Sequence, residues 1–200
     1  MDKLQACAQV FYNLLDIQYK LKVGRKGHLF DICISFSKED FHHLLGLQKL
    51  KDNDYIRTTA RAKIFDRILD GTITYELMQK SVFFPEMASR IDPFLQFESF
   101  LDSNDTIFSY LEKNNNYSII NADYLMLNLL GGAEVFLFLS KCQEGDADTY
   151  FCRTFFPKTS LDYTTNQSRY TLLYKEKVNM KTGACILQFD KSNNVAEKKL

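Results

Sequence analysis

The hydrophobic pattern of this chain changes its period near residue 116, and this change most constrains the possible folds. From Tyr55 to Lys113 the apolar residues recur at helical spacing, interrupted by Pro85 and Pro93. Beyond residue 116, short apolar or alternating runs are separated by turn signals such as Gly131-Gly132, a pattern typical of strands. Because the connections between these runs are short, they predict antiparallel pairing.

The first 52 residues predict a helix, a hairpin and a second helix. Apolar spacing favours a helix over 2–17, and alternation on both sides of the GRKG turn at 24–27 predicts a β-hairpin. From Ser37 to Leu50 we expect an amphipathic helix, with Ser37 at its N-cap and Asp40 bonding back to it.

The element order predicts an α+β fold in a single nuclease-like domain of residues 1–200. It consists of N-terminal helices and a hairpin, a helical insertion at about 55–113, and a C-terminal antiparallel four-stranded sheet of the barnase/RelE type in a core at about 117–190. We expect strands at 135–140, 149–157, 170–178 and 184–189, a short strand at 117–121, and either helix or strand at 122–130. The helical insertion contains no His or Cys, so we expect packing or recognition from it rather than chemistry.

Composition indicates a cytoplasmic protein. Five scattered cysteines without a CxxC pair favour free thiols in a reducing compartment. No secretory signal is visible, and no apolar run approaches the roughly 18 residues of a membrane-spanning helix. Lys plus Arg and Asp plus Glu number 25 each, so no net charge draws the chain toward polyanions, although cations outnumber anions from Arg153 to Lys181.

Several classes of chemistry lack their motifs. There is no GxxxxGK[ST] and no GxGxxG after a strand, which argues against a nucleotide-dependent enzyme. His42 and His43 are adjacent, so on a helix their rings diverge by about 100° and one metal ion cannot easily take both. We expect neither a cofactor nor a metal.

One stripe of the helix predicted after Ser37 carries reactive groups. His42, Gly46 and Lys49 follow i, i+4, i+7 spacing, whereas His43 shares a stripe with Leu47 and Leu50 and is expected to be structural. An imidazole transfers protons near neutral pH, an ammonium neutralises phosphate, and Gly46 between them leaves room for a ligand. The alternatives are a histidine packed at a helix–sheet contact and a solvated lysine at a helix end.

A second candidate region runs from Phe155 to Glu176, and Arg153 just before it is counted with it. Basic residues alternate there with tyrosines, threonines and a glutamine, a mixture suited to single-stranded RNA; the alternative is an ordinary solvent-facing sheet. The residues are Arg153, Lys158, Tyr163, Thr164, Thr165, Gln167, Arg169, Tyr170, Tyr174 and Lys175. RNA cleavage without a metal needs a base for the ribose 2′-OH, an acid for the leaving oxygen and a cation for the phosphate. His42, Lys49 and either Lys175 or Tyr174 supply these groups if the helix packs on the sheet.

Four sequence blocks resemble a known family. FHHLLGLQKLKD at 41–52, TYFCRTFFP at 149–157, DYTTNQSRYTLLYKEKV at 162–178 and NMKTGACIL at 179–187 are similar to the fourth phage-associated branch of the barnase–EndoU–colicin–RelE-like nucleases. The resemblance implies an N-terminal helix packed on a four-stranded antiparallel sheet and an RNase or toxin-like role in mobile elements. Its functional positions correspond to His42, Gly46, Lys49, Tyr163, Thr164, Gln167, Tyr174 and Lys175.

The leading hypothesis is therefore a metal-independent, RNA-cleaving, toxin-like nuclease that acts through the ribose 2′-OH. His42, Lys49, Lys175 and Tyr174 are its predicted catalytic residues, and Gly46, Arg153, Tyr163, Thr164 and Gln167 its predicted substrate contacts. RNA and an antitoxin or immunity protein are the expected partners. The alternative is a non-catalytic protein- or nucleic-acid-binding module on the same fold, with the helical insertion as docking surface and His42 buried away from any polar cleft.

Overall fold

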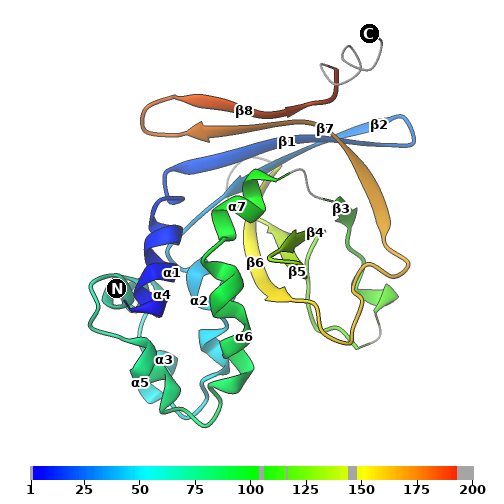
Figure 1. Cartoon of the computed structure of the whole chain (residues 1–200). Coiled ribbons are helices and arrows are strands. Elements are labelled where there is room, and N and C mark those ends of the chain that lie inside the picture. Colours follow the sequence, from blue (N-terminus) through cyan, green and yellow to red (C-terminus); the bar gives the residue numbers. More distant parts are fainter. Residues whose placement is uncertain (1, 104–105, 116, 144–147, 193–200) are drawn as a thin grey trace.

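The strands close into a barrel. The computed structural model describes residues 2–103, 106–115, 117–143 and 148–192. The eight strands of these residues form one sheet in the order β1-β2-β6-β5-β4-β3-β7-β8, and an additional β1–β7 pairing closes seven of them into a barrel (Figure 1). The strands are β1 Ile17–Arg25, β2 His28–Ser35, β3 Thr106–Ser109, β4 Tyr124–Leu130, β5 Ala133–Lys141, β6 Thr149–Pro157, β7 Ser168–Asn179 and β8 Cys185–Asp190.

Two long-range pairings bring the N-terminal hairpin into the barrel. β1 runs antiparallel to β7, from Ile17 opposite Asn179 to Gly24 opposite Thr171. β2 runs parallel to β6, with Cys33 opposite Thr149, so the sheet is mixed. The predicted four-stranded C-terminal sheet is therefore wrong.

The error lies in strand pairing more than in strand position. The four expected strands exist as β5 to β8, and 122–130 contains β4, but 117–121 forms no strand. β3 arises inside the segment predicted to be helical and joins β4 to the first residues of β7. Tyr19, Leu21 and Val23 alternate along β1 and are fully or almost fully buried. Closure of the barrel is favourable because it removes this apolar surface from water. Closure also pairs strand edges that an open sheet would expose.

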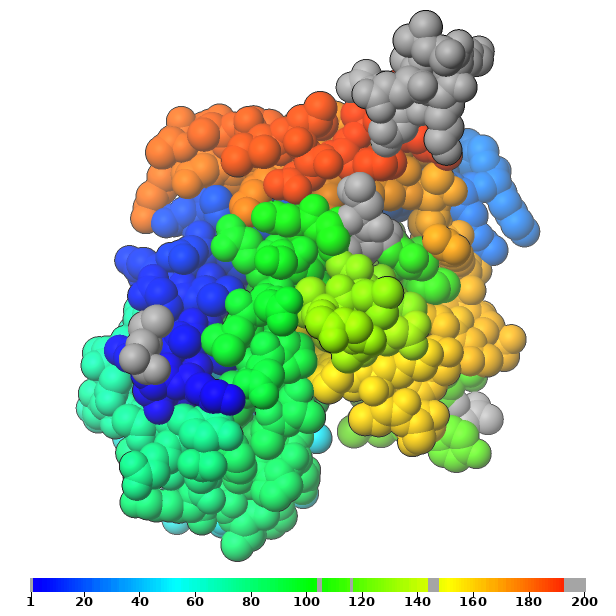
Figure 2. All heavy atoms as spheres, in the orientation of Figure 1, coloured from blue at the N-terminus to red at the C-terminus, as the bar shows by residue number. Residues whose placement is uncertain are grey.

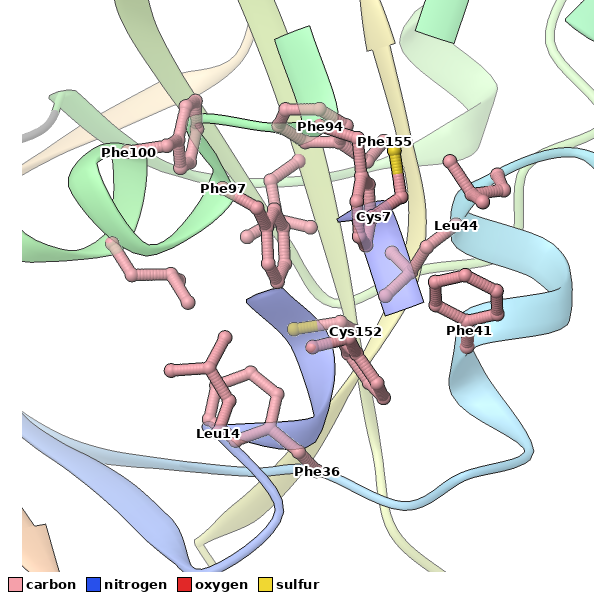
Figure 3. Packing of buried hydrophobic residues seen from close by; sticks show 14 of the residues in the cluster. Cys7, Leu14, Phe36, Phe41, Leu44, Phe94, Phe97, Phe100, Cys152 and Phe155 are labelled. Carbon is pink, nitrogen blue, oxygen red and sulfur yellow. The ribbon is translucent and has the colours of Figure 1, made fainter. Parts of the chain in front are cut away.

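The helices pack together on one side of the barrel and share its core. They are α1 Lys3–Tyr12, α2 Asp40–Leu44, α3 Asp54–Thr58, α4 Arg61–Leu69, α5 Tyr75–Gln79, α6 Pro85–Phe94 and α7 Phe97–Asp102, with single turns η1 Leu47–Lys49 and η2 Glu112–Asn114. Phe94 and Phe97 stack at 4.8 Å, and both present themselves edge-on to Phe155 of β6 (Figure 3). Each such buried aromatic ring contributes about 1.5–3 kcal/mol, which fixes α6 against β6.

The helix predicted from Ser37 to Leu50 is interrupted. The expected bond at its start exists, since the Ser37 backbone N–H donates to the Asp40 carboxylate at 2.8 Å, but α2 begins only at Asp40 and its N-cap residue is Glu39 rather than Ser37. α2 then ends at Leu44, and Gly46 adopts φ +77°, the left-handed conformation that terminates helices. The chain resumes as the short turn η1, so His42, Gly46 and Lys49 do not form one helical stripe.

A second, smaller core lies on the opposite face of β5. Val135, Leu137 and Leu139 enter the main core, whereas Phe136 and Phe138 pack with Tyr110, Leu125 and the ring of Tyr163. The Tyr163 ring lies 5.4–5.6 Å from Phe136, Phe138 and Phe156. This second core holds the β6–β7 connection beside the site described next. None of the described helices has the length and apolar character needed to cross a lipid bilayer.

Candidate active site

A cleft of about 450 Å³ lies between the helices and β6. The surface is indented where α6 (green) approaches the yellow β6 region (Figure 2). Four segments far apart in sequence meet here: α2 with η1, α6, the stretch at 119–120, and β6 with the connection that follows it. The lining residues are His43, Gln48, Lys49, Glu86, Ser89, Arg90, Ile119, Ile120, Arg153, Thr154, Phe156, Pro157, Thr159 and Tyr163.

Arg90 of α6 joins these segments. It is buried, with 7% of its surface exposed. Its Nη1 donates to Thr154 Oγ1 at 3.0 Å, to the Phe155 carbonyl at 3.1 Å, and to the His43 and Leu44 carbonyls at 3.4 Å. Its guanidinium also lies 5.3 Å from the centre of the Phe156 ring. One side chain thus fixes the end of α2 against β6.

The charge of Arg90 is not neutralised by a carboxylate among the described residues. Burial lowers the pKa of Arg90 to about 10, so the side chain remains cationic at neutral pH. Its Nε and Nη2 make no hydrogen bond with the described residues, although the side chain lines the cleft. Cationic donors without an acceptor in the protein can bind an anion that enters the cleft, which makes this end of the cleft suited to an anion.

Gly46 makes room for Arg90. A Cβ at this position would lie 3.0 Å from Arg90 Nε and 3.1 Å from its Cδ, and the positive φ independently favours glycine. Gly46 was predicted to admit a ligand. In the structure it admits an arginine that itself faces the cleft.

His43, not His42, lines the cleft. Burial, reinforced by the charges of Arg61, Arg153 and Arg90, lowers the pKa of His43 to about 4. The imidazole is therefore neutral at physiological pH and able to accept a proton. Its cationic neighbours would also receive negative charge that develops near it.

His42 is buried on α2, with 6% of its surface exposed, and does not line the cleft. Its ring centre lies 5.6 Å from that of His43, and its Nδ1 has no hydrogen-bond partner among the described residues. Burial lowers its pKa to about 4. A buried His42 was the expectation of the binding-module alternative, but here a polar cleft lies next to it.

Lys49 and Arg153 both line the cleft, as does Tyr163, so the structure gathers three of the predicted residues. Lys49 Nζ lies 3.8 Å from the Glu86 carboxylate, a long and partly exposed pair. Arg153 is exposed and forms no salt bridge with the described residues. With Arg90, these side chains provide three cations opposed by one lining carboxylate, Glu86.

Thr164 and Gln167 have local partners instead. The Thr164 hydroxyl and backbone N–H donate to Asp162, which forms a turn. The Gln167 amide accepts from the Leu111 N–H at 2.8 Å and donates to the Leu111 carbonyl at 3.0 Å, which ties the β6–β7 connection to the chain before η2. Neither residue lines the cleft.

Lys175 and Tyr174 lie elsewhere on β7. Lys175 is 1% exposed, donates to the Ser103 carbonyl at 2.5 Å and lies 5.7 Å from the Tyr19 ring centre. Tyr174 donates to Glu176 at 2.6 Å and lines a different hollow over β1, β2 and β7. The structure does not bring either residue to the cleft.

Arg90 was not among the predicted site residues, because the helical insertion contains no His or Cys and was expected to provide packing or recognition. One signal was present. Arg90 lies three residues after Met87 and four before Phe94, on the buried face of α6, and a charged residue on an apolar face requires a partner or a ligand.

Comparison with known proteins identifies a family. No curated protein and no solved structure matches the chain. Residues 3–192 do match the model of the family described as phage-Barnase-EndoU-ColicinE5/D-RelE like nuclease4, which confirms the resemblance seen in the sequence blocks. Because the match covers almost the whole chain, including every segment that lines the cleft, this protein belongs to that family of phage-associated, nuclease-like proteins.

Proposed function

We propose that the protein is a toxin-like ribonuclease of phage or mobile-element origin, and that it cleaves RNA through attack of the ribose 2′-OH on the adjacent phosphate. A single observation carries this proposal: the cleft holds a neutral, base-competent His43 beside Lys49, Arg90 and Arg153. The family match supports the nuclease class.

The reaction needs three contributions from the cleft. His43 removes the proton from the 2′-OH, and the oxygen forms a bond to phosphorus. Lys49, Arg90 and Arg153 stabilise the extra negative charge on the pentacoordinate phosphate. The bond from phosphorus to the 5′-oxygen then breaks, and Lys49 supplies the proton to that leaving oxygen, which yields a 2′,3′-cyclic phosphate and a 5′-OH end.

Arg90 has two roles in this scheme. Its Nη1 holds α2 to β6 through the contacts to His43, Leu44, Thr154 and Phe155, while Nε and Nη2 remain for the phosphate. The planar guanidinium of Arg90 therefore fixes the position of the phosphate relative to the backbone of His43, the proposed base. Such preorganisation lets a cation act without reorganising during the reaction.

The direct test compares three substrates of identical sequence: RNA, DNA and 2′-O-methyl RNA. We expect cleavage of RNA alone, with 2′,3′-cyclic phosphate ends identified by mass spectrometry, because only RNA has the attacking hydroxyl. Total RNA and tRNA serve as broader substrates, and growth arrest on expression tests the toxin-like role. Cleavage of the DNA or of the methylated RNA would contradict the proposed mechanism.

The adjacent histidines provide a matched pair for this test. His43→Ala should lower the cleavage rate by about 100- to 10,000-fold, the usual contribution of an acid–base group. His42→Asn should retain most of the rate in folded protein, since His42 does not line the cleft. The reverse pattern would restore His42 as the base. No cleavage by wild type, with RNA still bound, would favour a non-catalytic binding module.

A further inference from the structure

A second hollow lies next to the cleft and shares the Tyr163 side chain with it. It has a volume of about 270 Å³. It is lined by Asn114, Asn115, Tyr117, Ser118, Leu161, Asp162, Tyr163 and Thr165. The stretch 117–120 passes from one space to the other, because Tyr117 and Ser118 line the hollow and Ile119 and Ile120 line the cleft. A ligand lying across Tyr163 would occupy both.

The two spaces differ in chemistry. The cleft is lined by Lys49, Arg90 and Arg153, whereas the described residues that line the hollow include no Lys or Arg. The carboxylate in the hollow, Asp162, is already bonded to Lys158 at 3.1 Å and to Thr164. What remains is amide, hydroxyl and aromatic. This set does not attract a phosphate, but it suits an uncharged planar ring with donors and acceptors on its edge.

Several groups in the hollow are unused. The Asn114 side-chain oxygen, the Thr165 hydroxyl and the Tyr163 hydroxyl make no hydrogen bond with any residue that the structure describes. Tyr117 exposes 85% of its surface, an unusual cost for a large ring. An exposed ring next to unused polar groups is the arrangement that proteins use to stack and read a nucleobase.

The wall between the two spaces is rigid. Phe136, Phe138 and Phe156 surround the Tyr163 ring at 5.4–5.6 Å and meet it edge-on or nearly so. Asn115 Nδ2 donates to the Tyr163 carbonyl at 3.3 Å, and Asn114 Nδ2 donates to the Asn166 carbonyl at 2.8 Å. The hollow therefore exists before any ligand binds, and its ordering costs little on binding.

We propose that this hollow is a nucleobase subsite, which binds the base of a nucleotide next to the phosphate held in the cleft. Tyr117 provides the stacking face, and Asn114 and Thr165 contact the edge of the base. Gln167 and Asn115 are positioning residues that hold the connection around Tyr163. The inference rests on the proposed ribonuclease function, since it takes the cleft to be the phosphate site.

Binding without cleavage tests the subsite on its own. The probes are the four nucleoside 3′-monophosphates and ribose 5-phosphate, which lacks a base, titrated against the full chain by calorimetry. We expect at least one nucleotide to bind more tightly than ribose 5-phosphate. Tyr117→Ala should remove about 5- to 100-fold of that preference, as expected for loss of one stacked base. Affinity for ribose 5-phosphate should not change.

Tyr12→Ala is the matched control, because Tyr12 is also exposed, at 49%, and does not line either space. Tyr117 projects into solvent, so its removal should not alter the melting temperature. Equal affinity for ribose 5-phosphate and all four nucleotides would overturn the subsite, as would an unchanged preference in Tyr117→Ala. If RNA is cleaved but the subsite test fails, the ribonuclease proposal stands and only the subsite is overturned. If binding depends on the base but RNA is not cleaved, only the ribonuclease proposal is overturned.

Discussion

Two groups of cationic side chains differ in how closely carboxylates pair with them. Lys177 lies 2.7 Å from Glu98 and 3.1 Å from Asp102 of α7, and it lies 5.4 Å from the centre of the Tyr19 ring, near buried Lys175. In the cleft, Arg90 and Arg153 have no carboxylate partner among the described residues, and Lys49 has a long contact to Glu86.

This difference separates structural cations from those available to a ligand. Lys175 and Lys177 join β7 to α7 and the residue that follows it, because Lys175 donates to the Ser103 carbonyl and Lys177 to Glu98. Their ammonium groups therefore stabilise the fold. The cations of the cleft remain next to open space, and they suit an incoming phosphate. A lysine in a basic, tyrosine-rich segment is therefore a weak indicator of function until its counterions are known.

The largest expected contrast is between Arg90 and Lys175. Arg90→Met should lower kcat/KM for RNA by about 100- to 1,000-fold, because a preorganised cation is lost at the phosphate. Lys175→Met should leave kcat/KM within about twofold and cost roughly 1–3 kcal/mol of stability, since the Ser103 carbonyl loses its donor. Initial rates and urea unfolding measure the two effects. Loss of activity in a fully folded Lys175→Met would break the distinction.

The pH profile gives the next largest effect. With the pKa of His43 near 4, its base form dominates at pH 5, whereas a histidine with a pKa of 6.5 would be mostly protonated there and its rate roughly 30-fold below its own plateau. We expect kcat/KM to fall only below about pH 4–5. Arg153→Gln removes a charge that lowers the pKa of His43, so its acid limb should move upward. A wild-type limb near 6.5, with folding checked by circular dichroism, would contradict this role.

Alanine variants of two glycines distinguish the effect of backbone strain from the effect of displacing Arg90. Gly46→Ala and Gly27→Ala each place a Cβ on a residue with φ near +80°, at a cost of about 1–2 kcal/mol. Only the Cβ at Gly46 meets a neighbour, Arg90. We expect both variants to lose stability, and only Gly46→Ala to lose about tenfold in kcat/KM. Equal activity in the two would show that the position of Arg90 is not critical.

The smallest effect concerns salt. Binding to single-stranded RNA weakens with salt, and each contact between a cationic side chain and a phosphate adds about 0.7 to the magnitude of the slope of log K against log salt. Lys49→Gln and Arg153→Gln should each reduce the slope for RNA binding by about this amount. Lys177→Gln should leave it unchanged, because Lys177 is held by Glu98 and Asp102. Fluorescence anisotropy with a labelled oligonucleotide measures the slopes, and a reduced slope in Lys177→Gln would assign that lysine to the RNA surface.

The sequence by itself determined the N-terminal hairpin, the positions of the four C-terminal strands and the family. Turn signals and alternation placed the β1–β2 hairpin, and the segment between the turn at 142–148 and the polar loop after Pro157 was predicted as a strand with the bounds that β6 has, Thr149–Pro157. Lys49, Arg153 and Tyr163 were identified from residue type, and all three line the cleft. These features were accessible because period, turn chemistry and side-chain chemistry are encoded by neighbours in the chain.

Only the tertiary structure decided which strands pair, which histidine faces the cleft, and where Arg90 lies. The β1–β7 pairing joins residues 147 to 162 positions apart, and its stability depends on apolar surface buried by the whole barrel. The left-handed Gly46 ends α2 early, and Lys49 lines the same cleft as His43, whereas His42 does not line it. Both outcomes depend on contacts between distant segments, and no local pattern contains the free energy of those contacts.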